Sequence, residues 1–98
     1  MIYKLAYTID ALDDINRAHV HYESRSAGLG GRFTARLSTA LDTIARMPHL
    51  FGEIVPSVRA GMPSKFPYVI YYHIDGAMVV VFAVLHGATD PAVWQSRL

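Results

Sequence analysis

The first half of the chain carries apolar residues at helical spacing in two separate stretches. In the first stretch, apolar side chains recur every three or four residues, and Thr8 or Asp10 can cap the helix by accepting a hydrogen bond from a free backbone N–H group. That stripe consists of Ile9, Leu12, Ile15, Ala18 or His19, and Tyr22. The polar residues expected on the other faces are Asp13, Asp14, Arg17, His21 and Glu23. We expect Ser24 to Gly28 to end this helix.

A second apolar stripe follows at once, and Pro48 ends it because proline disfavours helical backbone in the residue before it. The stripe consists of Leu29, Phe33, Leu37, Leu41, Ile44 and Met47. Gly30 and Gly31 weaken its first turn. Since the break between the two stripes is short, we expect the two helices to form an antiparallel hairpin.

The remaining apolar runs are typical of β-strands. Two of them flank Asp75-Gly76, a dipeptide that favours a tight hairpin turn because both of its residues tolerate positive φ. The expected strands are Ile2–Tyr7, Ser57–Met62, Val69–Ile74 and Met78–Leu85, and the expected connections are His49–Pro56 and Pro63–Pro67. Pro91 can start a short helical turn that runs through Trp94 and Arg97. The pattern predicts an α+β fold of order β-α-α-β-β-β, with an antiparallel-rich sheet and a helical hairpin packed on one face.

The strand Met78–Leu85 is apolar on both of its alternating sets of positions. A strand that is buried on one face only alternates apolar with polar residues. Because the helical hairpin covers one face of the sheet, something else must cover the second face. The alternatives are the tail around Trp94, a twin subunit and a foreign partner. The apolar residues on the second face of this strand favour a protein–protein interface and coverage by the tail about equally.

Composition narrows the class of protein. A chain of 98 residues that is 52% hydrophobic forms one domain, residues 1–98, with one core. It has no Cys, and its acidic residues from Asp10 on exclude a signal peptide, so we expect a cytoplasmic protein. The longest apolar run, Ala77 to Leu85, is too short to span a bilayer. A net charge of +1 is too small for binding to nucleic acid by bulk attraction.

The sequence offers no catalytic or metal-ligating pattern. His19 and His21 are two residues apart and point to different faces of a helix, whereas a helical metal pair needs a spacing of three or four. Ser24, Ser26 and Ser57 have no nearby His and acid that could activate a hydroxyl. We therefore expect no catalytic residue, no metal and no cofactor.

Five segments in register resemble the ParE toxins of the RelE/ParE superfamily. They are Ala11-Leu12-Asp13-Asp14-Ile15, Leu29-Gly30-Gly31-Arg32-Phe33, Ile44-Ala45-Arg46-Met47-Pro48, Phe66-Pro67-Tyr68-Val69-Ile70-Tyr71-Tyr72, and Val84-Leu85-His86-Gly87 with Asp90-Pro91 and Trp94. The resemblance implies the toxin of a bacterial type II toxin–antitoxin system, of the kind linked to plasmid stabilisation and growth arrest. It implies a ParD-like antitoxin as partner, DNA gyrase as target, and DNA contact only through the antitoxin.

The same resemblance raises an alternative, because RelE members of the superfamily cut mRNA on the ribosome with basic residues and a late Tyr. Here the strand Met78–Leu85 has no Arg or Lys, and the turn after His86 is Gly87-Ala88-Thr89, where relatives often carry arginine. No Tyr follows Tyr72. These departures favour action by binding over RNA cleavage. A RelE-like nuclease and a non-toxic member of the fold remain the alternatives.

Basic and aromatic side chains are the candidates for contact with an antitoxin or target. Arg32 and Arg36, with Arg46, lie off the apolar stripe of the second helix and can form a basic surface. Arg59 either contacts an acidic partner or is an edge-strand arginine whose head reaches water. His86 either contacts a partner or bonds to a nearby turn. The full set of candidates is Arg32, Arg36, Arg59, Lys65, His73, His86 and Trp94.

Overall fold

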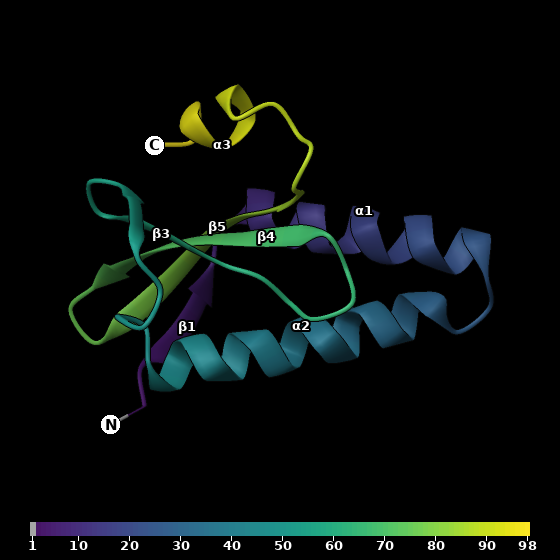
Figure 1. Ribbon diagram of the computed structural model, residues 1–98, viewed down its shortest axis with the longest axis horizontal. Coiled ribbons are helices and arrows are strands. Elements are labelled where there is room, and N and C mark those ends of the chain that lie inside the picture. Colours follow the sequence, from purple (N-terminus) through teal and green to yellow (C-terminus); the bar gives the residue numbers. More distant parts are fainter. Residues whose placement is uncertain (1) are drawn as a thin grey trace.

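The computed structural model describes residues 2–98 as a five-stranded mixed sheet, with two long helices on one face and a short helix on the other (Figure 1). In chain order the elements are β1 (Lys4–Tyr7), α1 (Ile9–Arg25), α2 (Leu29–Arg46), β2 (Glu53–Val55), β3 (Val58–Gly61), β4 (Tyr68–Asp75), β5 (Met78–His86) and α3 (Ala92–Gln95). The strand order is β1-β5-β4-β3-β2. Strand β1 runs parallel to β5, and all other neighbours are antiparallel. The predicted α+β fold with a helical hairpin on one face is confirmed.

Two local predictions need correction. The segment expected as one loop, His49–Pro56, contains strand β2, which pairs with β3 at the edge of the sheet. A strand of three residues is too short to show a period of two, so no pattern in the sequence predicts β2. The β4–β5 hairpin is confirmed, but its turn is centred on Gly76-Ala77, because Asp75 and Met78 still pair. Gly76 takes the positive φ, 57°, at the first turn position.

Helix α1 begins after Thr8, whose hydroxyl accepts a hydrogen bond from the Ala11 N–H group at 3.1 Å. Its buried residues are Ala11, Asp14 and Ala18. The expected apolar stripe is therefore wrong at its start, where Ile9 is 78% exposed and Leu12 51% exposed. Asp14 was expected on a polar face and is instead among the most buried side chains of the helix.

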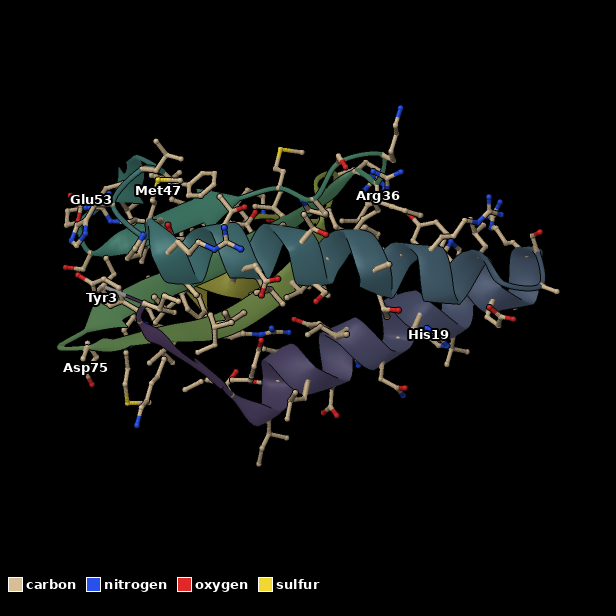
Figure 2. The ribbon with its side chains drawn as sticks, turned by 90° about the horizontal axis from the view of Figure 1, so that it is seen from below. Tyr3, His19, Arg36, Met47, Glu53 and Asp75 are labelled. Atoms are coloured by element: carbon tan, nitrogen blue, oxygen red, sulfur yellow. The ribbon has the colours of Figure 1, made fainter. Side chains whose placement is uncertain are left out.

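Helix α2 buries its predicted stripe from Phe33 to Ile44, whereas Met47 caps the helix and is about half exposed. The short link from α1 is held by Glu23, whose carboxylate accepts hydrogen bonds from the N–H groups of Gly28 and Gly30, both at 3.0 Å. These two bonds hold the pKa of Glu23 below its usual value. The predicted antiparallel hairpin is confirmed, with α1 and α2 side by side (Figure 2).

The main core lies between this hairpin and the sheet. Its largest fully buried side chains are Tyr72, Phe33, Ile44, Ile70, Val79, Val81 and Val84. Tyr72 donates its hydroxyl hydrogen to the Pro48 carbonyl at 2.6 Å, and burial raises the pKa of this phenol to about 12.

The second face of the sheet is covered by the tail of the same chain (Figure 1). Trp94 is 6% exposed and stacks on Tyr71, with ring centroids 5.1 Å apart and planes inclined by 18°. It packs with Val58, Phe82 and Ala83 in a second, smaller cluster. Of the three alternatives for this face, the structure shows the tail, which explains why β5 is apolar on both sides.

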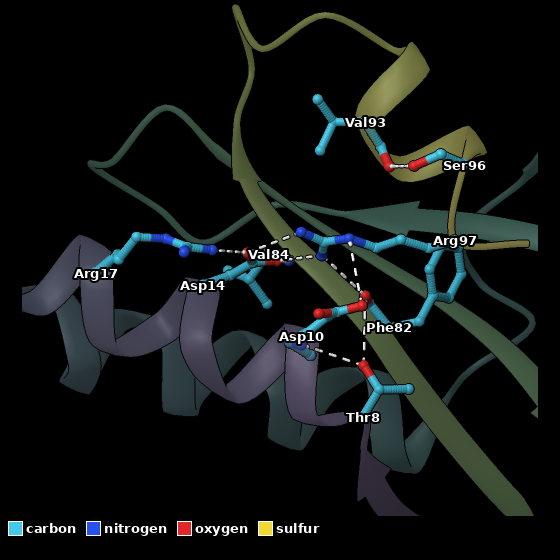
Figure 3. Close-up of polar contacts among 10 residues, drawn as sticks. Thr8, Asp10, Asp14, Arg17, Phe82, Val84, Val93, Ser96 and Arg97 are labelled. Carbon is cyan, nitrogen blue, oxygen red and sulfur yellow. Dashed lines mark hydrogen bonds and ion pairs between the residues drawn. The ribbon is translucent and has the colours of Figure 1, made fainter.

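Strand β5 loses its neighbour halfway along, because β1 ends at Tyr7 opposite Val81. Beyond Val81, side chains instead of a neighbouring strand form hydrogen bonds with the backbone groups of β5 (Figure 3). The Val84 N–H group donates to Asp14 Oδ2 at 3.0 Å, and the Phe82 carbonyl accepts from Arg97 Nη1 at 3.1 Å. Phe82 is free for this role because it forms a bulge, as Tyr71 pairs with Ala83 and Tyr72 with Val81. Polar side chains thus complete the sheet.

Among residues 2–98, no helix is long and apolar enough to cross a membrane. The same described residues contain no group of three or more His, Cys, Asp or Glu that could hold a metal ion.

Candidate functional site

Three of the candidate basic residues meet in one pocket. Arg32, Arg36 and Lys65 line a cavity of about 350 Å³, together with Leu29 and Phe66. We call this cavity, with those five residues, the basic pocket. None of the five is acidic, so its charge is uncompensated within its own walls.

The pocket is built from two parts of the chain that are distant in sequence. Arg32 and Arg36 are one turn apart on α2, on the side away from the buried stripe. Lys65 belongs to the loop between β3 and β4 and has a positive φ of 73°. Arg36 Nη1 donates to Ser64 Oγ at 3.3 Å, which joins the helix to this loop.

The apolar part of the pocket rests on a packed aromatic cluster. The Phe66 ring meets Tyr22 edge-on at a centroid distance of 4.9 Å and Phe33 at 5.3 Å. Tyr68 contacts the same two rings at 5.9 Å and 5.1 Å. The half-buried Phe66 ring therefore packs against a fully buried side chain, Phe33, which restricts its position. The pocket therefore presents a well-packed apolar surface beside exposed cations.

The groups of this pocket are hydrogen-bond donors beside an apolar floor, an arrangement suited to binding. Guanidinium and ammonium groups donate hydrogen bonds to carboxylates and phosphates, and the aromatic floor accepts an apolar side chain. Exposed cations in this setting raise the rate of association with an acidic partner more than they raise affinity. The geometry matches an acidic segment that carries an apolar anchor.

Arg59 lies elsewhere. It pairs with Tyr72 across β3 and β4, which puts it on the helix side of the sheet. Its Nη1 donates to the Phe51 carbonyl at 2.6 Å, and the residue is half-buried. Of the two alternatives for Arg59, the edge-strand arginine is wrong, because β2 lies outside β3 in the sheet and the guanidinium is bonded within the chain. Contact between Arg59 and a partner stays a prediction.

His73, Trp94 and His86 are also separated from the basic pocket. His73 lies on the tail side of the sheet, its ring 6.0 Å from that of Phe82, and Trp94 is buried on that same side. His86 Nδ1 accepts a hydrogen bond from the Ala88 N–H group at 3.0 Å, which confirms the bond to a nearby turn. The structure thus brings together Arg32, Arg36 and Lys65 and disperses the other candidates.

The sequence interpretation missed Asp14 and Arg97. Arg97 holds Asp14 through two hydrogen bonds, of 2.6 Å and 3.1 Å, and Asp14 raises the pKa of Arg97. A signal was available in Ala11, Asp14 and Ala18, whose spacing marks one helix face with small residues on either side of the acid. Small residues allow close approach to the sheet, so this face is the buried one.

The fold matches those of solved toxin–antitoxin structures. The chain superposes on a chain of "Chromosomal ParDE TA system from P. aeruginosa" with a TM-score of 0.73 and 14% identity, covering 87% of this chain and 96% of that one. It superposes on a chain of the toxin–antitoxin complex RelBE2 from Mycobacterium tuberculosis with a TM-score of 0.62 and 19% identity, covering 88% and 99%. At these identities the likeness establishes the fold. A comparison with curated proteins finds no match.

The sequence itself carries the family. Residues 5–91 match the profile of the family described as "ParE toxin of type II toxin-antitoxin system, parDE". The match runs from the second residue of β1 to the segment before α3, so it includes the helical hairpin, the basic pocket and all of the sheet except Lys4. The chain therefore belongs to the ParE toxin family of type II toxin–antitoxin systems.

Proposed function

We propose that this ParE-family chain inhibits DNA gyrase by binding and that a ParD-like antitoxin neutralises it. On this proposal the toxin acts in the cytoplasm, arrests growth when it is free, and stabilises the plasmid or locus that encodes the pair. It contacts DNA only through the antitoxin. The family match supports the toxin role, and the two solved relatives, both named as toxin–antitoxin systems, support an antitoxin partner.

The basic pocket is the observation that carries the proposed partner contact. Its cations, Arg32, Arg36 and Lys65, are exposed and close to an apolar floor at Phe66. An acidic segment of the antitoxin with one apolar side chain fits this combination, because the carboxylates meet the cations while the apolar group covers Phe66. We assign the pocket to that segment.

The dispersal of the other basic residues supports binding over catalysis. Cleavage of RNA through its 2′-hydroxyl requires several donors around one phosphorane and a group that moves protons. Arg59 and His73 lie on opposite sides of the sheet, and His86 is at the far end of β5. This dispersal of the three side chains supports a toxin that acts through a surface.

Induction of the chain without any antitoxin tests the proposed target. We expect filamented cells, and the purified chain should inhibit gyrase supercoiling in vitro. Normal supercoiling together with cut ribosome-bound mRNA would replace the gyrase proposal with the RelE-like nuclease. No growth phenotype and no effect on gyrase would identify a non-toxic member of the fold.

Charge-removing variants test the proposed antitoxin contact. Arg32→Gln with Arg36→Gln should slow association with the cognate antitoxin by about tenfold at low salt, and the difference should shrink as salt rises. Arg46→Gln is the matched control, because Arg46 is exposed on the same helix and does not line the pocket. If the control slows association as much as the double variant, the pocket is not the contact.

A further inference from the structure

A second cavity lies apart from the basic pocket, between α1 and the end of β5. Its volume is about 460 Å³, within the range of small-molecule sites. Its polar groups come from Arg17 and His21 of α1, Tyr68 of β4, His86 at the end of β5 and Thr89 in the turn that follows. We call this cavity the α1–β5 cleft.

Donors dominate the polar groups of this cleft. The Arg17 side chain is 70% exposed. Its Nη2 donates to Asp14 Oδ1 at 2.9 Å, and its other N–H groups remain available to a ligand. His86 Nδ1 accepts from the Ala88 N–H group, so in the neutral ring the proton sits on Nε2 and can be donated. The hydroxyls of Tyr68 and Thr89 and the ring of His21 make no hydrogen bond within residues 2–98.

The single acid of the cleft is already neutralised. Asp14 is 1% exposed at its side chain, and its oxygens receive Arg97 at 2.6 Å and 3.1 Å, Arg17 at 2.9 Å and the Val84 N–H group at 3.0 Å. Figure 3 shows Arg17, Asp14 and Val84 together at this place. Because these donors bond the Asp14 carboxylate, it repels a second anion less than an unpaired carboxylate would.

The other wall of the cleft is apolar. Ala18 and Val20 of α1 face the cavity from one side, and Val84 and Leu85 of β5 from the other. Val20 is 56% exposed. A bare inorganic anion would leave this apolar surface uncovered, whereas an organic body attached to the anion would cover it.

We propose that the α1–β5 cleft binds a phosphate monoester, with the phosphate at Arg17 and His86 and the organic body on the apolar wall. Three terminal oxygens suit a set of donors drawn from a guanidinium, imidazoles and hydroxyls, and Arg forms its strongest bonds with phosphate or carboxylate. The Tyr68 phenol is protonated at neutral pH even at its ordinary pKa of 10.0, and burial raises that pKa further, so its hydroxyl can donate. The cleft shares no lining residue with the basic pocket.

Titration of the full chain with AMP, inorganic phosphate and adenosine, followed by amide NMR, tests the proposal. AMP should shift the amides of Arg17 and of residues 86–89 at millimolar concentrations, inorganic phosphate should do so more weakly, and adenosine should leave them unmoved. Shifts confined to the basic pocket, or no shifts with AMP, would overturn the proposal. Inorganic phosphate binding as tightly as AMP would overturn the role of the apolar wall.

Variants separate the cleft from general attraction to a basic protein. Arg17→Gln should weaken AMP binding about tenfold or more, because a hydrogen bond to a charged group is lost. Arg25→Gln is the control, since Arg25 is an exposed arginine at the end of the same helix and does not line the cleft. Equal weakening in both variants would refute the site. Thr89→Val, which removes a donor from the turn, gives a second test if Arg17→Gln perturbs the fold.

Discussion

The Arg97 guanidinium lies 2.6 Å from a carboxylate oxygen of Asp14 and so joins the end of the chain to the first helix across β5. Asp14 is 1% exposed at its side chain and Arg97 15%, so the pair is desolvated. Between them they also bond the N–H group of Val84 and the carbonyl of Phe82, which β1 is too short to reach. One ion pair thus holds the tail in place and completes the sheet.

Removal of Asp14 should therefore be costly. Asp14→Ala leaves the Arg97 charge half-buried without its partner and the Val84 N–H group without an acceptor, and we expect it to lower the free energy of unfolding by about 3–5 kcal/mol. Urea unfolding measures this loss. The neighbouring Asp13→Ala is the control, because Asp13 is exposed. A loss no larger than that of the control would mean that the pair contributes little.

The adjacent glycines Gly30 and Gly31 should respond oppositely to alanine. A Cβ atom at Gly30 would lie 2.7 Å from the His19 carbonyl oxygen, so α1 and α2 would have to move apart. At Gly31 a Cβ atom meets nothing within 4 Å. We expect Gly30→Ala to destabilise by about 1–3 kcal/mol and Gly31→Ala to stabilise by up to about 1 kcal/mol. Thermal unfolding of the two variants decides, and equal effects would contradict the close helix contact at Gly30.

Trp94 is the one tryptophan of the chain and reports directly on the tail. Since it is buried against Tyr71 and Val58, its fluorescence should be blue-shifted and protected from acrylamide in the native state. Truncation before Trp94 should expose Val58 and Phe82 and so increase binding of an apolar dye. Emission typical of a solvated indole in the native protein would show that the tail does not cover the sheet.

Alkaline pH should weaken the fold through Tyr72. In the unfolded chain this phenol ionises near its ordinary pKa of 10, whereas burial raises its pKa to about 12 in the folded protein. Between these values the unfolded state loses the proton first, so stability is complete below pH 10 and falls as pH rises toward 12. Denaturant unfolding against pH should show a shallower fall for Tyr72→Phe than for the parent chain.

If the free energy of unfolding falls as steeply with pH in Tyr72→Phe as in the parent chain, the alkaline loss of stability comes from other phenols. Burial also raises the pKa values of Tyr7, Tyr68 and Tyr71, so part of the alkaline loss should persist in the variant. The lost hydrogen bond to the Pro48 carbonyl should lower stability by about 1 kcal/mol at neutral pH, where the pH effect is absent.

The features that depend on neighbouring residues were predictable from the sequence. The stripe from Phe33 to Ile44 is buried as its spacing requires, Thr8 caps α1, and Gly76 takes the positive φ of the β4–β5 turn. Periodicity reports which side of an element is apolar, and turn and cap residues act through bonds a few positions away. The order of helices and strands follows from these local effects, with the short β2 as the exception.

Tertiary structure decided which distant groups meet. Asp14 and Arg97 are 83 positions apart, and Arg36 and Ser64 are 28 apart, so no local pattern links either pair. Beyond Val81, β5 has no neighbouring strand on the β1 side. The buried Asp14 carboxylate therefore accepts a hydrogen bond from the Val84 N–H group of β5. Whether a polar residue lies in water or in the core depends on what the rest of the chain brings against it. The buried face of an element can therefore be predicted from the spacing of apolar residues in one sequence, whereas the position of a charged side chain depends on the whole fold.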